Sequence, residues 1–157
     1  TYDDMMCRDS LYTAKCDVPG FRDGFREYEQ AIIELRSKFS PGMGVDYLLD
    51  LLSRMSKDSG VTTRDNGVSQ EVEARQGVSL KAMVTVKPRV ALRPFRTFLE
   101  VEQPESEFLL RLDDNGNVGL FEADGGMWEQ AAKANILAYF EDKLAEEVKG
   151  GKIVVMM

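Results

Sequence analysis

The chain has 157 residues, a net charge of −7, no histidine and two cysteines. The length fits one domain of ordinary size, and 43% hydrophobic residues is typical of a folded globular chain. The lack of histidine excludes Ser-His and Cys-His catalysis, histidine metal ligands and a histidine pH switch. No stretch reaches the roughly 18 apolar residues of a membrane helix, and no signal-peptide pattern is present, so we expect no membrane partner.

The negative charge is uneven along the chain. Residues 113–157 carry 4 basic and 9 acidic side chains, whereas residues 61–112 carry 8 and 7. An acidic end disfavours broad nucleic-acid binding, so nucleic acid is a less favoured partner than protein. Cys7 and Cys16 cannot close a tetrahedral zinc site without ligands from another chain, and we expect both thiols to be reduced and no cofactor to be bound.

The first half predicts a strand and a helical hairpin. Residues 10–18 alternate as a half-buried strand does, with Cys16 on the apolar face. Apolar residues at steps of three and four predict a helix from Phe21 to Phe39. A second helix is predicted from Asp46, as its N-cap, through Met55 to a stop at Gly60.

Two β-hairpins are predicted next. Alternation favours strands at 68–76 and 78–87, with the corner at Gln76-Gly77. The pair Asn115-Gly116 favours a type I′ turn with two loop residues. That turn sets a register of three facing pairs, in which the apolar side chains share one face: Leu112 with Gly119, Leu110 with Phe121, and Phe108 with Ala123.

The chain is predicted to end with a helix from Met127 to Val148 and a strand at 152–156. Helices kept apart from hairpins indicate an α+β fold with a mostly antiparallel sheet. We expect the two hairpins and the terminal strands to form that sheet, packed against the helical hairpin and the long last helix. Residues 1–157 are predicted to form a single domain.

A charged and aromatic segment is the main candidate for interaction. Basic residues at Lys87, Arg89, Arg93 and Arg96 alternate with aromatic ones, Phe95 and Phe98, a mixture that can bind single-stranded nucleic acid. Carboxylates follow at once, at positions 100, 102, 105 and 107. We favour a salt-bridge network, within one chain or across a subunit boundary.

Two carboxylates at a strand end are the weak metal candidates. Glu122 and Asp124 could hold Mg²⁺, as carboxylates do in many phosphoryl-transfer enzymes. The favoured alternative is that Asp124 caps the helix that follows.

Two stretches are specific enough to carry a resemblance: Leu92-Arg-Pro-Phe-Arg-Thr-Phe-Leu-Glu-Val-Glu-Gln-Pro-Glu-Ser-Glu-Phe108 and Leu120-Phe-Glu-Ala-Asp-Gly-Gly-Met-Trp128. They resemble the YfdQ-like family of uncharacterised phage and prophage proteins. Two further stretches are similar to that family, at 25–39 and 65–70, so the resemblance covers most of the chain from about residue 11. It implies a phage-encoded protein in the host cytoplasm. It assigns no catalytic residue.

Members of that family carry more sequence before the position of Thr1, so we expect this chain to be the C-terminal part of a longer phage protein.

We expect a non-enzymatic binding or assembly protein, a homo-oligomer or the partner of a phage or host protein. It would assist phage DNA metabolism or neutralise a host defence component. The alternative is a Mg²⁺-dependent nuclease or other phosphoryl-transfer enzyme using Glu122 and Asp124. The candidate interaction residues are Arg89, Arg93, Phe95, Arg96, Phe98, Glu100, Glu102 and Gln103.

Overall fold

The computed structural model describes residues 13, 15, 20–55, 63–65, 70–76, 80–113 and 115–156, with backbone alone at 63–65, 72–76 and 80–84. The elements in chain order are β1 (Gly24–Arg26), α1 (Tyr28–Ser37), α2 (Met43–Arg54), β2 (Thr63–Asp65), β3 (Gln70–Gln76), β4 (Leu80–Val86), β5 (Arg89–Leu92), β6 (Ser106–Leu112), β7 (Val118–Glu122), α3 (Trp128–Lys143) and α4 (Ala145–Lys149). This mixture confirms the predicted α+β fold class.

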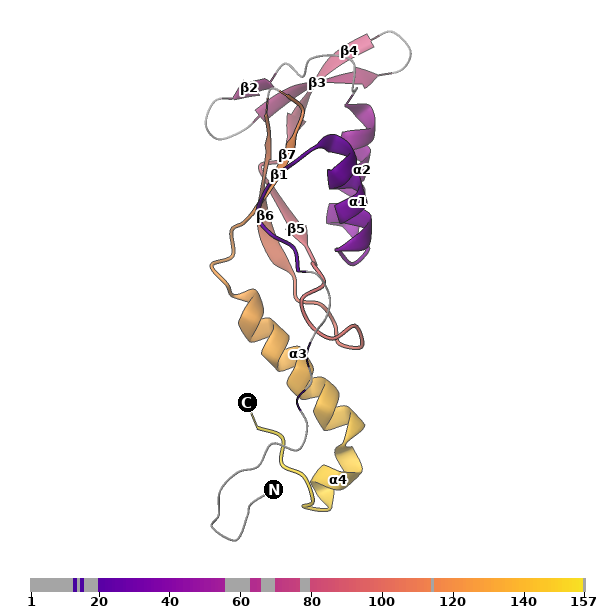
Figure 1. The fold of residues 1–157 in the computed structure, drawn as a ribbon, viewed down its shortest axis with the longest axis vertical. Coiled ribbons are helices and arrows are strands. Elements are labelled where there is room, and N and C mark those ends of the chain that lie inside the picture. Colours follow the sequence, from indigo (N-terminus) through magenta and orange to yellow (C-terminus); the bar gives the residue numbers. More distant parts are fainter. Residues whose placement is uncertain are drawn as a thin grey trace.

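The strands form two antiparallel sheets. One has four strands in the order β1-β7-β6-β5, and the other has three in the order β2-β3-β4. Helices α1 and α2 lie along one face of the four-stranded sheet, and α3 extends beyond its far end (Figure 1). The predicted hairpins therefore belong to different sheets.

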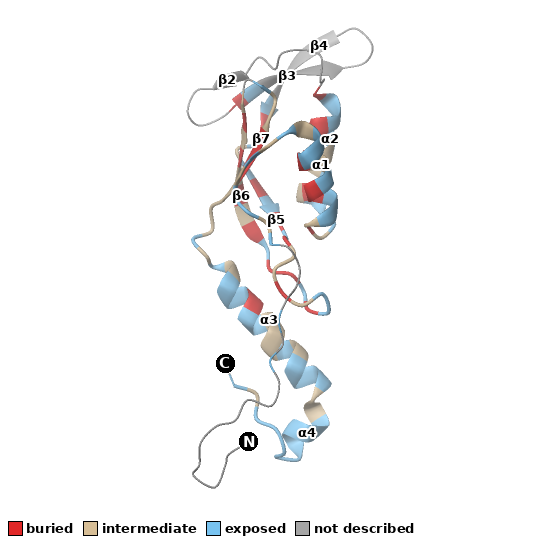
Figure 2. Cartoon of the chain, viewed as in Figure 1, coloured by how far each residue is buried: buried red, intermediate tan, exposed pale blue. Residues whose placement is uncertain are grey.

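The core lies between the four-stranded sheet and α1–α2. Strand β6 alternates strictly, and its buried positions are Ser106, Phe108, Leu110 and Leu112. They face fully buried leucines from the two helices, Leu35, Leu48 and Leu52. Figure 2 shows the buried residues gathered in this body and few of them along α3 and α4. The apolar side chains that alternate along β6 and those spaced by three and four along α1 and α2 thus pack into one layer.

The predicted helix at 21–39 is wrong in its first part, because residues 24–26 form β1 and the helix begins at Tyr28. Gly24 has a φ of 138°, outside the helical region. Phe25 pairs with Gly119 of β7, and its ring lies 5.5 Å from that of Phe121. The spacing predicted that Phe25 lies on the apolar stripe of a helix. Phe25 instead lies in a strand and packs against an aromatic ring of β7.

The N-cap of α2 is Gly42, four residues before the predicted one, and Asp46 lies in the first turn of the helix. The helix ends at Arg54, and the predicted stop at Gly60 lies outside the described residues. The predicted strand at 10–18 lies outside them too, apart from residues 13 and 15, as do both cysteines.

The first predicted hairpin is present as β3 and β4. Gln76 pairs with Leu80, so residues 77–79 connect the strands, and those residues lie outside the description. Strand β2, which pairs with β3, had no prediction.

The register predicted for the second hairpin is wrong by one residue. Leu110 faces Leu120, Leu112 faces Val118, and Phe108 faces Glu122. The cause is a three-residue loop, 114–116, closed by a hydrogen bond from the Asp113 N–H to the Asn117 carbonyl at 3.1 Å. Gly116 takes a φ of 79°, the left-handed position that such a loop needs. This register sets Val118 and Leu120, both buried, opposite Leu112 and Leu110, and leaves Phe121 only half-buried.

The last predicted helix is divided at Leu144 into α3 and α4, and only Ala132 of its apolar stripe is buried. The predicted strand at 152–156 is wrong, because residues 153–156 have no regular structure and pair with no described strand. The β-branched run there has no sheet edge beside it.

Candidate interaction site

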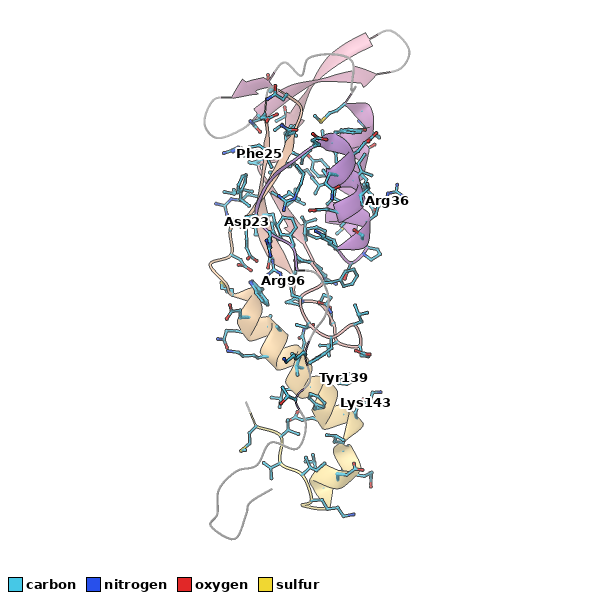
Figure 3. The ribbon with its side chains drawn as sticks, viewed as in Figure 1. Asp23, Phe25, Arg36, Arg96, Tyr139 and Lys143 are labelled. Carbon is cyan, nitrogen blue, oxygen red and sulfur yellow. The ribbon has the colours of Figure 1, made fainter. Side chains whose placement is uncertain are left out.

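Arg96 is the best-enclosed charge in the candidate segment, with 9% of its side chain exposed. Its Nη2 lies 2.5 Å from Glu122 Oε1, and its Nη1 donates to Ser106 Oγ at 3.0 Å. The guanidinium also lies over the Trp128 ring, 4.3 Å from its centroid. Figure 3 places Arg96 where the sheet meets the start of α3. An arginine held by a carboxylate, a hydroxyl and an aromatic face joins these elements.

The other two arginines form exposed ion pairs within the chain. Arg89 Nη1 lies 2.7 Å from Glu107 Oε2, across the β5–β6 pair. Arg93 pairs with Glu105 at 3.3 Å and with Glu102 at 3.5 Å. Exposed pairs of this kind contribute little to stability. They do balance most of the positive charge that suggested a nucleic-acid site.

Gln103 holds the segment through its buried side-chain amide. Its Oε1 accepts from the backbone N–H groups of Arg96 and Thr97, at 2.9 and 3.1 Å. Its Nε2 donates to the carbonyls of Phe98 and Val101, at 2.9 and 3.0 Å. A buried amide that satisfies four backbone groups fixes an irregular loop. Gln103 therefore acts inside the segment.

The remaining candidates do not gather into one surface. Phe95 and Phe98 are half-buried, and the Phe95 N–H donates to the Lys38 carbonyl at 2.9 Å. Glu100 is exposed at the tip of the segment. Lys87 is turned toward Tyr47, with its Nζ 4.9 Å from that ring. The structure brings Arg93 together with Glu102, and Arg96 together with Gln103. It does not arrange Phe95 and Phe98 with the cations as one surface on which bases could stack.

The two weak metal candidates have other contacts. Glu122 faces Arg96, and Asp124 Oδ1 accepts from the Gly126 N–H at 2.9 Å in the turn before α3. Burial raises the pKa of Asp124, but hydrogen bonds from Ser106, Gly126 and Trp128 and the charge of Arg96 together hold that pKa below its ordinary value. Among the described residues, no group of three or more Asp, Glu or Cys is placed to hold a metal ion.

Helix α3 rests on the candidate segment by its first two turns. Trp128 covers Arg96, Ala132 is buried, and Asn135 Nδ2 donates to the Glu102 carbonyl at 2.9 Å. Sequence reasoning missed Ser106, Trp128 and Asn135 as partners of the segment. The usable signal was that Arg96 and Trp128 belong to the two most distinctive stretches of the sequence, which the fold brings together.

No family model, curated protein or solved structure matches the chain. The resemblance to the YfdQ-like family therefore stays a prediction. Within the part of the chain that the structure describes, no helix is both long and apolar enough to cross a membrane.

Proposed function

We propose that this is a phage-encoded, non-enzymatic binding or assembly protein that acts in the host cytoplasm and associates with a second copy of itself. The observation that carries the proposal is the arm formed by α3, α4 and residues 150–156. The arm extends away from the sheet (Figure 1), and most of its length is exposed or only partly buried (Figure 2).

Among the described residues, the printed contacts of the arm with the sheet and the candidate segment lie near its start, at Trp128 and Asn135. After Asn135, the ring contacts and ion pairs of the described arm residues stay within the arm, as between Tyr139 and Phe140 and between Lys149 and Glu146. Its large exposed apolar residues are Phe140, Val148, Ile153, Val154 and Met156, and Met127 directly precedes it. They lie on α3, on α4 and in the tail, and exposed apolar side chains that form a contiguous patch mark an interaction surface.

A second copy is the partner that the charge of the arm favours. Residues 128–156 carry four lysines against five acidic side chains, a net charge of −1. Two arms can therefore lie together with little repulsion, whereas a strongly basic partner would gain little from this surface. A 16-residue helix is about 24 Å long. Together with the tail, such a helix is long enough to contribute to an interface of about 800 Å² per partner.

The resemblance to the YfdQ-like family supports the phage origin and the host cytoplasm. Within that setting the protein would assist phage DNA metabolism or neutralise a host defence component. We do not adopt the nuclease alternative, because Mg²⁺ would have to displace Arg96 from Glu122 and the Gly126 N–H from Asp124.

The test is the oligomeric state of variants that introduce charge, measured by native mass spectrometry and light scattering across the micromolar range. The double variant Phe140→Glu with Val148→Glu places two charges on the arm. The control Ile33→Glu changes an apolar residue on α1. Ile33 is 57% exposed, more than Phe140 at 40% and Val148 at 37%. We expect oligomers for the wild type and the control, and monomers for the arm variant. A monomeric wild type, or oligomers of the arm variant, would contradict the proposal.

A further inference from the structure

A second feature is a cavity of about 580 Å³ between residues 20–22, β1 and α1. Its described lining is Gly20, Phe21, Arg22, Arg26, Glu34 and Lys38. Three of these six side chains are cations and one is a carboxylate. In a chain with a net charge of −7, such a local excess of positive charge is unusual and calls for a ligand of opposite sign.

The carboxylate in the cavity is shared between two of the cations. Glu34 Oε2 lies 2.8 Å from Arg26 Nε, and Glu34 Oε1 lies 2.9 Å from Lys38 Nζ. Burial raises the pKa of Glu34, but the hydrogen bond from Lys38 and the charge of Arg26 outweigh it, so the pKa lies below its ordinary value. Glu34 therefore stays ionised and cancels one positive charge of three.

The cations remain able to donate to a ligand. The Arg26 side chain uses Nε for Glu34 and Nη2 for the Arg22 carbonyl, which leaves Nη1. Lys38 has three N–H donors, of which one points to Glu34. Arg22 is exposed at the entrance of the cavity. Guanidinium and ammonium groups that line one cavity, from a loop, from β1 and from the end of α1, suit the oxygens of a phosphate group.

An aromatic ring forms one side of the cavity. The Arg26 guanidinium lies 5.1 Å from the Phe21 ring centroid. The same ring packs 5.2 Å from Phe39 and 5.4 Å from Phe108, which are both in the core. Phe21 is thereby held in place and presents an apolar side next to the charges.

We propose that this cavity binds a small phosphate monoester, with the phosphate between Arg22, Arg26 and Lys38 and the organic part against Phe21. The two uncancelled positive charges match the two negative charges of a phosphate monoester near neutral pH. Glu34 orients the two cations and at the same time limits the affinity for the anion.

The probes are inorganic phosphate and phenyl phosphate, titrated calorimetrically at pH 8 with ionic strength held constant by NaCl. Lys38→Gln and Arg22→Gln each remove one cation and should weaken binding about tenfold, the loss of one charge-assisted hydrogen bond. Arg36→Gln is the matched control, because Arg36 lies in the last turn of α1, two residues before Lys38, and points away from the sheet (Figure 3). The control should bind as the wild type does.

Glu34→Gln separates ligand binding from a merely structural role. Removing this carboxylate should lower the melting temperature, because two cations lose their partner, yet it should strengthen phosphate binding severalfold. Phenyl phosphate should bind more tightly than inorganic phosphate if Phe21 contacts the organic part. The proposal is overturned if the wild type shows no saturable heat, if Arg36→Gln weakens binding as much as Lys38→Gln does, or if phenyl phosphate binds no better than phosphate.

Discussion

At the scale of single residues, Arg96 is the point at which three parts of the chain are joined. Its side chain contacts Ser106 of β6, Glu122 of β7 and Trp128 of α3. Arg93, three residues earlier, makes two longer ion pairs on the surface. The same residue type therefore has two roles in one segment, decided by burial. Charge alone would not distinguish them.

This difference predicts the effect of truncating each arginine. Arg96→Ala leaves Glu122 without its cation and should lower the free energy of unfolding by about 3 kcal/mol, the lower end of the range for a buried pair. Arg93→Ala should cost less than about 1 kcal/mol, because its partners are exposed. Urea unfolding followed by the fluorescence of Trp128, the only tryptophan, measures both. Equal losses would show that Arg96 does not join these elements.

Asp124 makes the stability depend on pH in a defined direction. Its pKa is lower in the folded chain than in the unfolded one, so the ionised form favours folding. This contribution is complete above the unfolded pKa of about 4 and is lost as the pH falls through the folded pKa. We expect Asp124→Asn to lose less unfolding free energy than the wild type between pH 7 and pH 3. Urea titrations at these two pH values test this, and parallel losses would contradict it.

At the scale of elements, the start of α2 depends on close approach to β5. A Cβ atom at Gly44 would lie 2.1 Å from the Ala91 carbonyl oxygen, whereas one at Gly42 would meet nothing within 4 Å. Helix propensity alone says that alanine stabilises a helical glycine position by about 1 kcal/mol. The contact with the backbone predicts a loss of stability at Gly44 instead. The carbonyl group of a paired strand cannot move aside as the end of a flexible side chain can.

We therefore expect Gly44→Ala to destabilise the protein by about 1–3 kcal/mol, the usual cost of overpacking. Gly42→Ala should change the free energy of unfolding by less than about 1 kcal/mol, since only the capping preference changes. Chemical denaturation of the two variants gives the comparison. A gain in stability for Gly44→Ala would mean that α2 does not approach β5 so closely.

The elements also show how far the sequence could predict the fold. Period and spacing were enough to predict that α1, α2, β3 and β4 exist, though not the bounds of α1 and α2, because each of these patterns is local. The register of β6 and β7 was predicted wrongly, since Asn115-Gly116 fits both a two-residue and a three-residue loop. Only the burial of Val118 and Leu120 against α1–α2 decides between them. Residues 24–26 form a strand because β7 lies beside them, and residues 153–156 form none because no described strand pairs with them. A local sequence pattern does not show which strands are neighbours.

The candidate site was predicted as a list of residues but not as an arrangement. Arg89, Arg93 and the following carboxylates suggested ion pairs, and the structure has several of them. The sequence could not predict that the Gln103 amide is buried and binds the backbone of its own segment, because a buried glutamine and an exposed one look alike in sequence. The cavity beside Phe21 was missed for a related reason: Glu34 and Lys38 stand four apart, but Arg26 reaches them only after the chain turns from β1 into α1.

At the scale of the whole molecule, burial is concentrated at one end. The sheet and α1–α2 hold nearly all of the described core, whereas α4 has no buried residue. Helices shorter than about 12–15 residues are marginal by themselves in water. Among the described residues, little of the core stabilises the outer part of the arm, so contacts with a second copy of the chain would add to its stability.

Amide hydrogen exchange at two protein concentrations tests this distribution. In dilute solution we expect the amides from Tyr139 to Val148 to exchange at least about a hundredfold faster than those of β6, because local opening there costs far less than global unfolding. At high concentration these arm amides should become protected, as a second copy covers them, while the exchange of β6 stays unchanged. Equal protection of arm and sheet in dilute solution would show that the arm folds together with the body. Oligomers whose arm amides stay unprotected would place the interface elsewhere.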